Sequence, residues 1–367
     1  MARRCSGRMV LPVFSDDFST VGGPASAPEA RKSAIEMQNR AKDGIAEKQL
    51  ALSGNNIFQC HVRDYIGANS TFPVPVMKRF KPAKALPAGF TPAMLAACQQ
   101  FLQREGVAAR LQWNEQEVFA SFDGWWLSSG FIAQARVRDG QCQLLQYAAR
   151  LRIFGQFGQT LPANWLFAMN YGEAKAVALL KLIRVLHVLN HLGRNGRHLP
   201  LRIDVDPRIC HAYSDRIVDF TARLLDVLEF PAAQAPMLLL LDSRTGELGL
   251  SLLRRYRQNG HGVGLGDFGA GHQDLLRLWR LEPDGLALAP SFMGRAIMYP
   301  TVREQLLALV PQLVEQGFAL AVEDIVCDNM LELALRMGAE HCSGPLLSER
   351  LKRQRAAREL DLSKIAC

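Results

Sequence analysis

The stretch Gly262-Val-Gly-Leu-Gly-Asp-Phe-Gly-Ala-Gly271 joins a short apolar run to a helical pattern at 272–281. A second short apolar run, Gly285-Leu-Ala-Leu-Ala289, follows that helix directly. Two short apolar strands that flank one helix predict a parallel β-α-β unit, because parallel strands need a long crossover, which is usually a helix. The sequence on both sides repeats this pattern.

Upstream of this unit, strands are predicted at 199–205 and 237–241, with helices at 173–192, 214–229 and 247–259. Downstream, strands are predicted at 319–323 and 341–345, with helices at 302–316, 329–337 and 348–360. Asp139-Gly140 is a hairpin turn signal between further strands at 131–137 and 143–153. Strand and helix that alternate about seven times over about 220 residues predict an α/β fold, and specifically a TIM-like (β/α)8 barrel.

The composition is that of a globular chain with a large core. Of 367 residues, 49% are hydrophobic and 21% are charged, which excludes a wholly disordered protein and a disulfide miniprotein. The net charge of +8 permits an acidic partner without identifying one. No run reaches the roughly 20 apolar residues of a membrane span, and eight cysteines without CxxC spacing indicate reduced thiols. We therefore expect a cytoplasmic protein with no membrane association.

The chain divides into four parts on composition. Residues 1–76 are rich in small and polar residues and read as a weakly ordered extension, and Met77 is a candidate for the true start of translation. Residues 77–124 read as a small helical segment, in which Thr91-Pro92 forms a helix start. The barrel is assigned to 125–350, and 351–367 form a basic tail.

Seven segments of the barrel region resemble, in order and spacing, the motifs of one known family. The run at 266–271 is similar to a DDFGTG loop, and the run at 147–152 stands in the place of an EALLR segment after the same hairpin. The seven segments are 147–152, 201–206, 237–243, 266–271, 285–292, 321–325 and 338–346. They resemble the EAL domain family, whose members are barrels and whose active members hydrolyse cyclic di-GMP.

The resemblance implies a site with two divalent metals, and this sequence departs from it at most ligand positions. Mg²⁺ and Mn²⁺ prefer carboxylate and other oxygen ligands. Three acids remain where the family has oxygen ligands: Asp204, Asp267 and Glu323. Residues that cannot replace the family's carboxylates, lysine or glutamine stand at Ala148, Leu239, Gly266, Ala287, Ala289, Val326 and Ser343. We therefore expect no metal, no cofactor and no catalytic residue, with the three acids as vestiges.

Arg152 matches the arginine of the EALLR segment. By that resemblance it is a candidate to hold a phosphate of a bound nucleotide, so binding of cyclic di-GMP without hydrolysis stays open. A cyclic di-GMP phosphodiesterase with a rebuilt site is the remaining alternative.

Other motifs favour structural interpretations. The G-x-G-x-x-G pattern that starts at Gly264 is not interpreted as a dinucleotide site: Glu282 and Asp284 lie near the place of the required acidic residue, but no β-α-β unit with that geometry opens the domain. His187 and His191 share a helix face, but no third zinc ligand follows them. Cys342 has no recognisable partner base.

Basic runs at 254–257 and 352–355 are predicted on helices, and no DNA-binding motif accompanies them. We therefore expect no direct DNA binding. The resemblance to inactive members of the family implies a non-enzymatic repressor of virulence-related gene expression. Such a repressor acts through contact with a protein partner, such as a transcription factor or a signalling protein.

Overall fold

The computed structural model describes residues 83–155, 158–163, 166, 172–205, 214–240, 246–270 and 274–365. The described residues belong to one compact unit. The predicted extension at 1–76 and the candidate start Met77 lie outside them.

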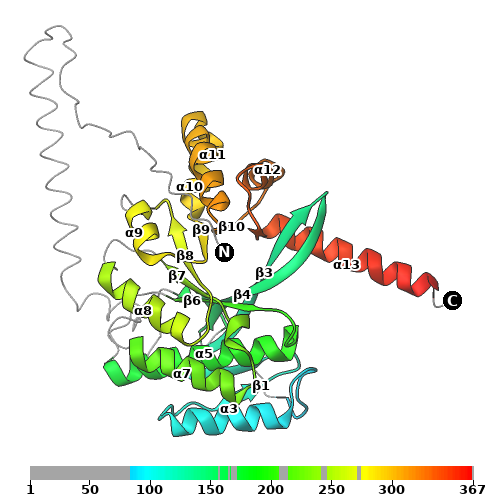
Figure 1. Ribbon diagram of the computed structural model, residues 1–367. Helices are drawn as coiled ribbons and strands as arrows, with labels where there is room; N and C mark the ends of the chain where they lie inside the picture. Colours follow the sequence, from blue (N-terminus) through cyan, green and yellow to red (C-terminus); the bar gives the residue numbers. More distant parts are fainter. Residues whose placement is uncertain are drawn as a thin grey trace, which may run out of the picture. The chain divides into compact units, whose positions relative to one another are not determined.

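Eight strands close into a barrel, as the sequence predicts (Figure 1). Around the ring each strand pairs with the next, and β3 pairs with β4 to close it. The order is β3 (Trp125–Arg138), β11 (His341–Cys342), β10 (Ala319–Val322), β9 (Gly285–Leu288), β8 (Val263–Phe268), β7 (Met237–Leu240), β6 (Leu201–Val205) and β4 (Gln141–Phe154). All neighbours are parallel except those of β3, which runs antiparallel to both β4 and β11.

The hairpin that opens the barrel forms at the predicted turn. Asp139 and Gly140 both have positive φ, at 49° and 75°, which is the backbone that a tight two-residue hairpin turn requires. The two strands are longer than predicted, since they begin at Trp125 and end at Phe154.

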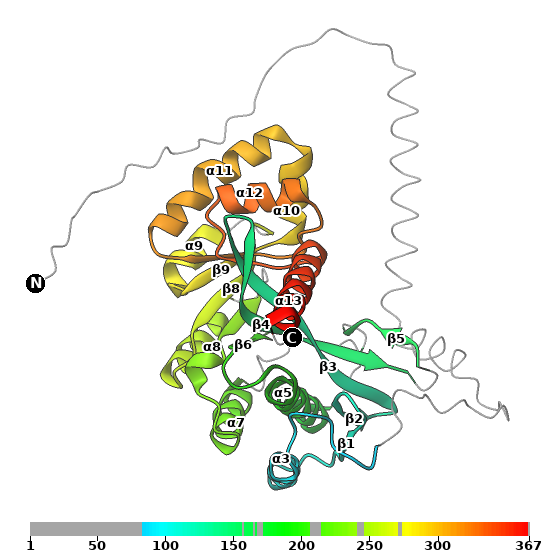
Figure 2. The same cartoon turned by 90° about the vertical axis from the view of Figure 1, so that its right-hand side faces the viewer.

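Helices follow the strands around the ring (Figures 1 and 2). They are α5 (Glu173–Asn195), α7 (Ser214–Val227), α8 (Gly246–Gln258), α9 (Asp274–Leu281), α10 (Pro290–Met298), α11 (Pro300–Glu315), α12 (Asp328–Arg336) and α13 (Pro345–Ile365). Helix α10 was not predicted. Its first residue, Pro290, suits a helix start, and a second proline, Pro300, begins α11 after the one-residue break at Tyr299.

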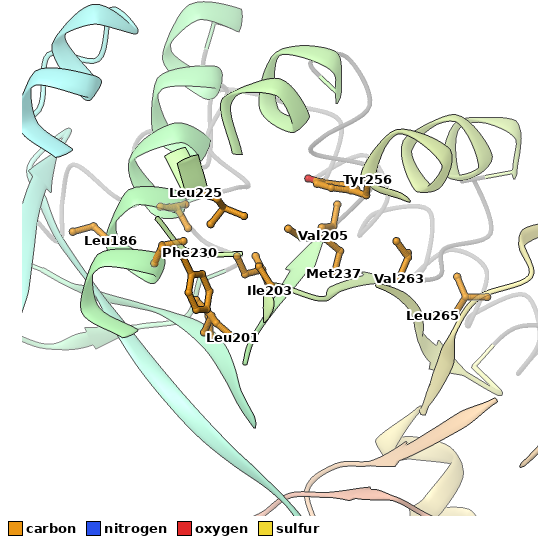
Figure 3. Packing of buried hydrophobic residues seen from close by; sticks show 14 of the residues in the cluster. Leu186, Leu201, Ile203, Val205, Leu225, Phe230, Met237, Tyr256, Val263 and Leu265 are labelled. Atoms are coloured by element: carbon orange, nitrogen blue, oxygen red, sulfur yellow. The ribbon is translucent and has the colours of Figure 1, made fainter. Parts of the chain in front are cut away.

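The core lies between the strands and the surrounding helices. Leu201, Ile203 and Val205 of β6 are at most 1% exposed and lie in a layer with Leu225 and Phe230 (Figure 3). Side chains alternate along a strand. Since the odd-numbered residues of β6 face the helices, the even-numbered ones face the barrel interior.

The segment before the barrel contains strands as well as the predicted helix. Helix α3 (Pro92–Arg104) begins at Thr91, whose side chain accepts a hydrogen bond from the Met94 N–H. Strands β1 (Leu111–Trp113) and β2 (Val118–Phe122) then form a hairpin, and β2 extends the sheet from β3. The Asn114 side chain caps the turn by accepting from two backbone N–H groups. The sequence reading missed this Asn-centred turn signal.

One described helix, α5, is long and apolar enough to cross a membrane by length and composition alone. However, 72% of its apolar stretch is buried within the fold. Its apolar residues are thus accounted for by core packing.

Candidate functional site

The retained acids lie where a barrel carries its chemistry, at the carboxyl ends of parallel strands. Asp204 is the penultimate residue of β6, and Asp267 is the penultimate residue of β8. Glu323 follows β10 directly. Asp267 has a φ of 55° at a register irregularity between β8 and β9, so its backbone leaves the regular strand there.

Two arginines pair with two of these acids inside the barrel mouth. Arg150 donates from Nη1 to Asp204 Oδ2 at 2.5 Å and from Nη2 to Glu323 Oε2 at 2.9 Å. Arg202 donates from Nε to Asp204 Oδ1 at 3.2 Å, and its Nη1 contacts Glu323 Oε1. Each acid therefore meets both guanidiniums, and we call these four residues the arginine–acid quartet.

Strand geometry explains how the quartet forms. Ala148 of β4 is in register with Arg202 of β6, and Arg150 lies two residues further along the same face of β4. This places Arg150 beside Asp204 on the neighbouring strand. Glu323 comes from the other side of the ring, so the arginines connect strands across the barrel interior.

Buried polar side chains extend the quartet toward β3 and β11. Gln134 is fully buried and donates to Glu323 Oε1 at 3.4 Å. Gln146 donates to Gln134 Oε1 at 2.7 Å and contacts His341 Nδ1 at 3.3 Å. A low-dielectric interior strengthens such connected bonds and raises the cost of breaking any one of them.

The formal charges of the quartet cancel, and burial dominates its electrostatics. Burial raises the pKa of Asp204, while Arg202 and Arg150 counteract this effect. Burial acts to lower the pKa of Arg202, but Asp204 and Glu323 more than offset it, so that pKa is raised. Arg202 is 5% exposed and therefore depends on these two acids for the compensation of its charge.

The quartet does not fit the divalent metals that the family resemblance implies. Both acids already pair with guanidiniums, and a metal ion there would add positive charge beside two cations. Among the residues that the structure describes, no group of three His, Cys, Asp or Glu side chains is placed to hold a metal ion.

Arg152, the candidate phosphate ligand, forms an ion pair outside the quartet. Its Nη2 donates to both carboxylate oxygens of Glu117 at 2.6 Å, and its guanidinium lies over the Phe154 ring. Glu117 is 2% exposed and also accepts from the Ser128 hydroxyl at 2.5 Å. A nucleotide phosphate at Arg152 would therefore compete with a buried carboxylate.

Strand β7 offers no metal ligand beside Asp204. Asp204 is in register with Leu238, and Val205 is in register with Leu239, the position matched to the family's glutamate. Neither leucine has a ligand atom.

The two arginines of the quartet were not predicted from the sequence. Arg150 stands two residues after Ala148, and Arg202 stands two residues before Asp204. Each thus lies on the same strand face as a position already matched to a metal ligand. The signal in the sequence is therefore an arginine two residues from a matched ligand position on the same strand.

The remaining candidates are structural in the fold. His187 Nδ1 lies 2.8 Å from the Ser129 hydroxyl, and His191 Nε2 lies 2.8 Å from the Leu199 carbonyl oxygen. Burial lowers the pKa of His187 to about 3 and that of His191 to about 4, so both rings are neutral at pH 7. Gly264 and Gly266 lie within strand β8 instead of in a strand-to-helix turn.

Cys342 is expected to be inert toward thiol reagents. Burial raises the pKa of Cys98 and of Cys342 to about 12, so almost no reactive thiolate exists at pH 8. We predict that iodoacetamide alkylates both at least about a hundredfold more slowly than exposed Cys327 in the native protein. Peptide mass spectrometry over time measures this, and fast native labelling of Cys342 would instead support a nucleophile.

Comparisons with known proteins agree with the barrel. The model of the EAL domain family matches residues 131–350. No protein of curated function matches the chain.

Solved structures match at low identity. Bacillus subtilis YkuI, with an EAL domain and in complex with substrate cyclic di-GMP and calcium, is 16% identical with a TM-score of 0.51. That match covers 65% of this chain and 64% of YkuI. Klebsiella pneumoniae BlrP1, in a manganese and cyclic di-GMP complex, is 18% identical with a TM-score of 0.50, over 61% of this chain and 59% of BlrP1.

The PaMucR phosphodiesterase in its cyclic di-GMP complex is 17% identical with a TM-score of 0.47. That match covers 69% of this chain and 95% of PaMucR. At these identities YkuI and BlrP1 support the fold alone. The family match spans more than half of the sequence, and the chain belongs to the EAL domain family.

Proposed function

We propose that this protein is a member of the EAL domain family that does not hydrolyse cyclic di-GMP and regulates gene expression through protein contacts. The observation that supports this most is the arginine–acid quartet. Arg150 and Arg202 hold both Asp204 and Glu323 at the carboxyl ends of the strands. Two-metal hydrolysis needs carboxylates that are available to cations at that place.

The alternative of a rebuilt hydrolase is disfavoured by energetics. To admit a metal, Asp204 and Glu323 would have to exchange guanidiniums for the ion, and Arg202 would remain buried without a counter-charge. Leaving a buried charge unpaired costs on the order of 3–5 kcal/mol. This cost opposes metal binding at the quartet.

The regulatory part of the proposal rests on resemblance. A barrel of this family that is preceded by a helical segment resembles BvgR, a repressor of virulence-repressed genes. By that resemblance we propose a repressor of virulence-related genes whose partner is a transcription factor or another signalling protein. Direct DNA binding is not part of the proposal, because the sequence carries no DNA-binding motif.

A second candidate is a cyclic di-GMP receptor without hydrolysis. The observation that favours it is the position of Arg150, whose side chain is 33% exposed at the barrel mouth and could meet a phosphate. Calorimetry with cyclic di-GMP in the absence of divalent metals tests this candidate. If binding occurs, loss of affinity in Arg150→Ala supports a phosphate at Arg150, whereas full affinity in Arg152→Ala shows that Arg152 does not hold one.

Deletion of the gene in its natural host separates a contact regulator from a hydrolase. We predict that transcripts of the repressed genes rise severalfold while the cellular concentration of cyclic di-GMP stays unchanged, because the quartet leaves no metal site for turnover. Transcript sequencing and mass spectrometry of the nucleotide measure both quantities in one culture. A rise in cyclic di-GMP on deletion, reversed by the wild-type gene, would contradict the proposal.

A further inference from the structure

The barrel interior is hollow toward the amino ends of its strands, and the burial pattern of β10 shows it. Leu320 and Val322, which face the helices, are at most 1% exposed. Ala319 and Ala321 share the inner face with Glu323 and are partly exposed. A barrel filled by layers of bulky branched side chains would bury its inner face as well. Solvent therefore reaches the inside of the ring at this end.

This opening leads into a cavity of about 150 Å³ that is lined by small residues. In-register pairing places Gly264 of β8 and Gly285 of β9 on the same face as Ala319, and all three line the cavity. Leu238 of β7 is level with Gly264 and covers it, because a Cβ added at Gly264 would lie 3.1 Å from Leu238 Cδ1. This part of the lining thus consists of glycine backbone, alanine methyl groups and one leucine side chain.

The polar side chains beside the cavity bond to other protein groups. Gln146 donates to Gln134 Oε1 at 2.7 Å and contacts His341 Nδ1 at 3.3 Å. The charge of Arg202 is compensated by the two acids of the quartet, and its Nη1 and Nη2 atoms are buried. A water molecule needs two to four polar partners to be held in a cavity. An apolar occupant therefore suits this space better than ordered water does.

The entrance to the cavity disfavours an anion. Pro236, Gly262 and Asp284 line it, and they directly precede β7, β8 and β9. The Asp284 carboxylate is 60% exposed and accepts from the Val263 N–H at 2.6 Å. An anion would pass this carboxylate and then lose its hydration without gaining a free cation. The occupant that fits both the entrance and the interior is uncharged.

We propose that this cavity binds a neutral, apolar molecule of the size of benzene or toluene. Protein cavities of about 150 Å³ with an apolar lining bind benzene. The ring lies against Leu238 and the methyl groups of Ala319 and Ala321, where glycine backbone on the neighbouring strands leaves it room. The site is at the opposite end of the strands from the quartet. It goes beyond the proposed regulatory function and does not depend on it.

Calorimetry on the full-length protein with toluene tests the site. We expect saturable binding of one toluene per chain. Benzoate, which has the same ring with a negative charge, is expected to bind at least about tenfold more weakly, because the cavity offers its charge no partner. Absence of saturable toluene binding, or equal affinity for benzoate, would overturn the proposal.

Two variants that fill the cavity locate the binding. Ala319→Leu and Ala321→Leu are each expected to weaken toluene binding at least about tenfold. Neither should lower the Tm of the ligand-free protein, because the added carbon atoms occupy empty apolar space. The matched control is Ala356→Leu, the same change at an exposed position of α13, and it should bind toluene as wild type does.

Two results with these variants would refute the site. Wild-type affinity for toluene in both filled variants would place the ligand elsewhere. A Tm several degrees lower in both would mean that the space is already occupied by protein atoms.

Discussion

Replacing Arg202 with methionine is expected to lower the free energy of unfolding by about 3–5 kcal/mol. Arg202 contacts both acids of the quartet and is 5% exposed. Methionine fills similar volume but leaves Asp204 and Glu323 with one guanidinium between them. Urea denaturation at pH 7, with the midpoint and slope compared with wild type, measures the loss.

Arg150→Met is the matched control for this prediction. Arg150 contacts the same two acids, but its side chain is 33% exposed, so water compensates part of its loss. We expect a cost of about 1–2 kcal/mol. Adding Glu323→Gln to Arg202→Met should restore part of the stability, since it removes one uncompensated acid. Arg202→Met without measurable cost would mean that the quartet does not form.

Acidification is expected to destabilise the fold strongly between pH 6.5 and about 4. His187 and His191 are buried as neutral rings, with pKa values of about 3 and about 4 in place of 6.5. The unfolded chain takes up protons below pH 6.5, while the folded chain does not until its lower pKa is reached. The stability from neutral burial is therefore fully present above pH 6.5 and is lost as pH falls toward 4.

The size of this loss follows from linkage. Each histidine whose pKa is lowered in the fold reduces the free energy of unfolding by about 1.4 kcal/mol for each pH unit below 6.5. The two together cost about 5 kcal/mol between pH 6.5 and 4.5, which is comparable with the whole stability of many domains. Urea denaturation at both pH values measures this difference.

His187→Gln tests the assignment, because it removes one titrating ring and leaves a side chain that can still reach the Ser129 hydroxyl. Its pH-dependent loss should be smaller than that of wild type by about 2 kcal/mol. Gly294→Ala is the control and should show the full wild-type loss, since it adds only a methyl group in open space. A wild-type loss in His187→Gln would contradict the neutral burial of this histidine.

The barrel was predictable because its signals are local and repeated. The runs at 199–205 and 285–289 became β6 and β9, since short apolar segments between helical patterns suit buried parallel strands. Strands β1 and β2 were not predicted, because the segment around their turn is polar in composition. The hairpin forms nonetheless, since the Asn114 side chain stabilises the turn by accepting two backbone hydrogen bonds. Helix α10 was not predicted because its nine residues, which begin at Pro290 and end two residues before Pro300, offer little periodicity.

The site was predictable only in part. The positions of Asp204, Glu323 and Ala148 followed from motif matching, but the arginines that pair with the acids did not. Which side chain crosses a barrel depends on register between strands far apart in sequence, such as β4 and β10. The sequence shows which residues of one strand share a face, because side chains alternate along it. The distances between side chains on different strands depend on how the ring closes.

Incubation of the purified protein with cyclic di-GMP, Mg²⁺ and Mn²⁺ tests the central claim most directly. Linear product is followed by chromatography against a chelated control, and binding is followed by calorimetry in the same buffer. The account predicts no linear product above the chelated control, because Arg150 and Arg202 occupy Asp204 and Glu323. Metal-dependent turnover that is abolished by Glu323→Gln would contradict it.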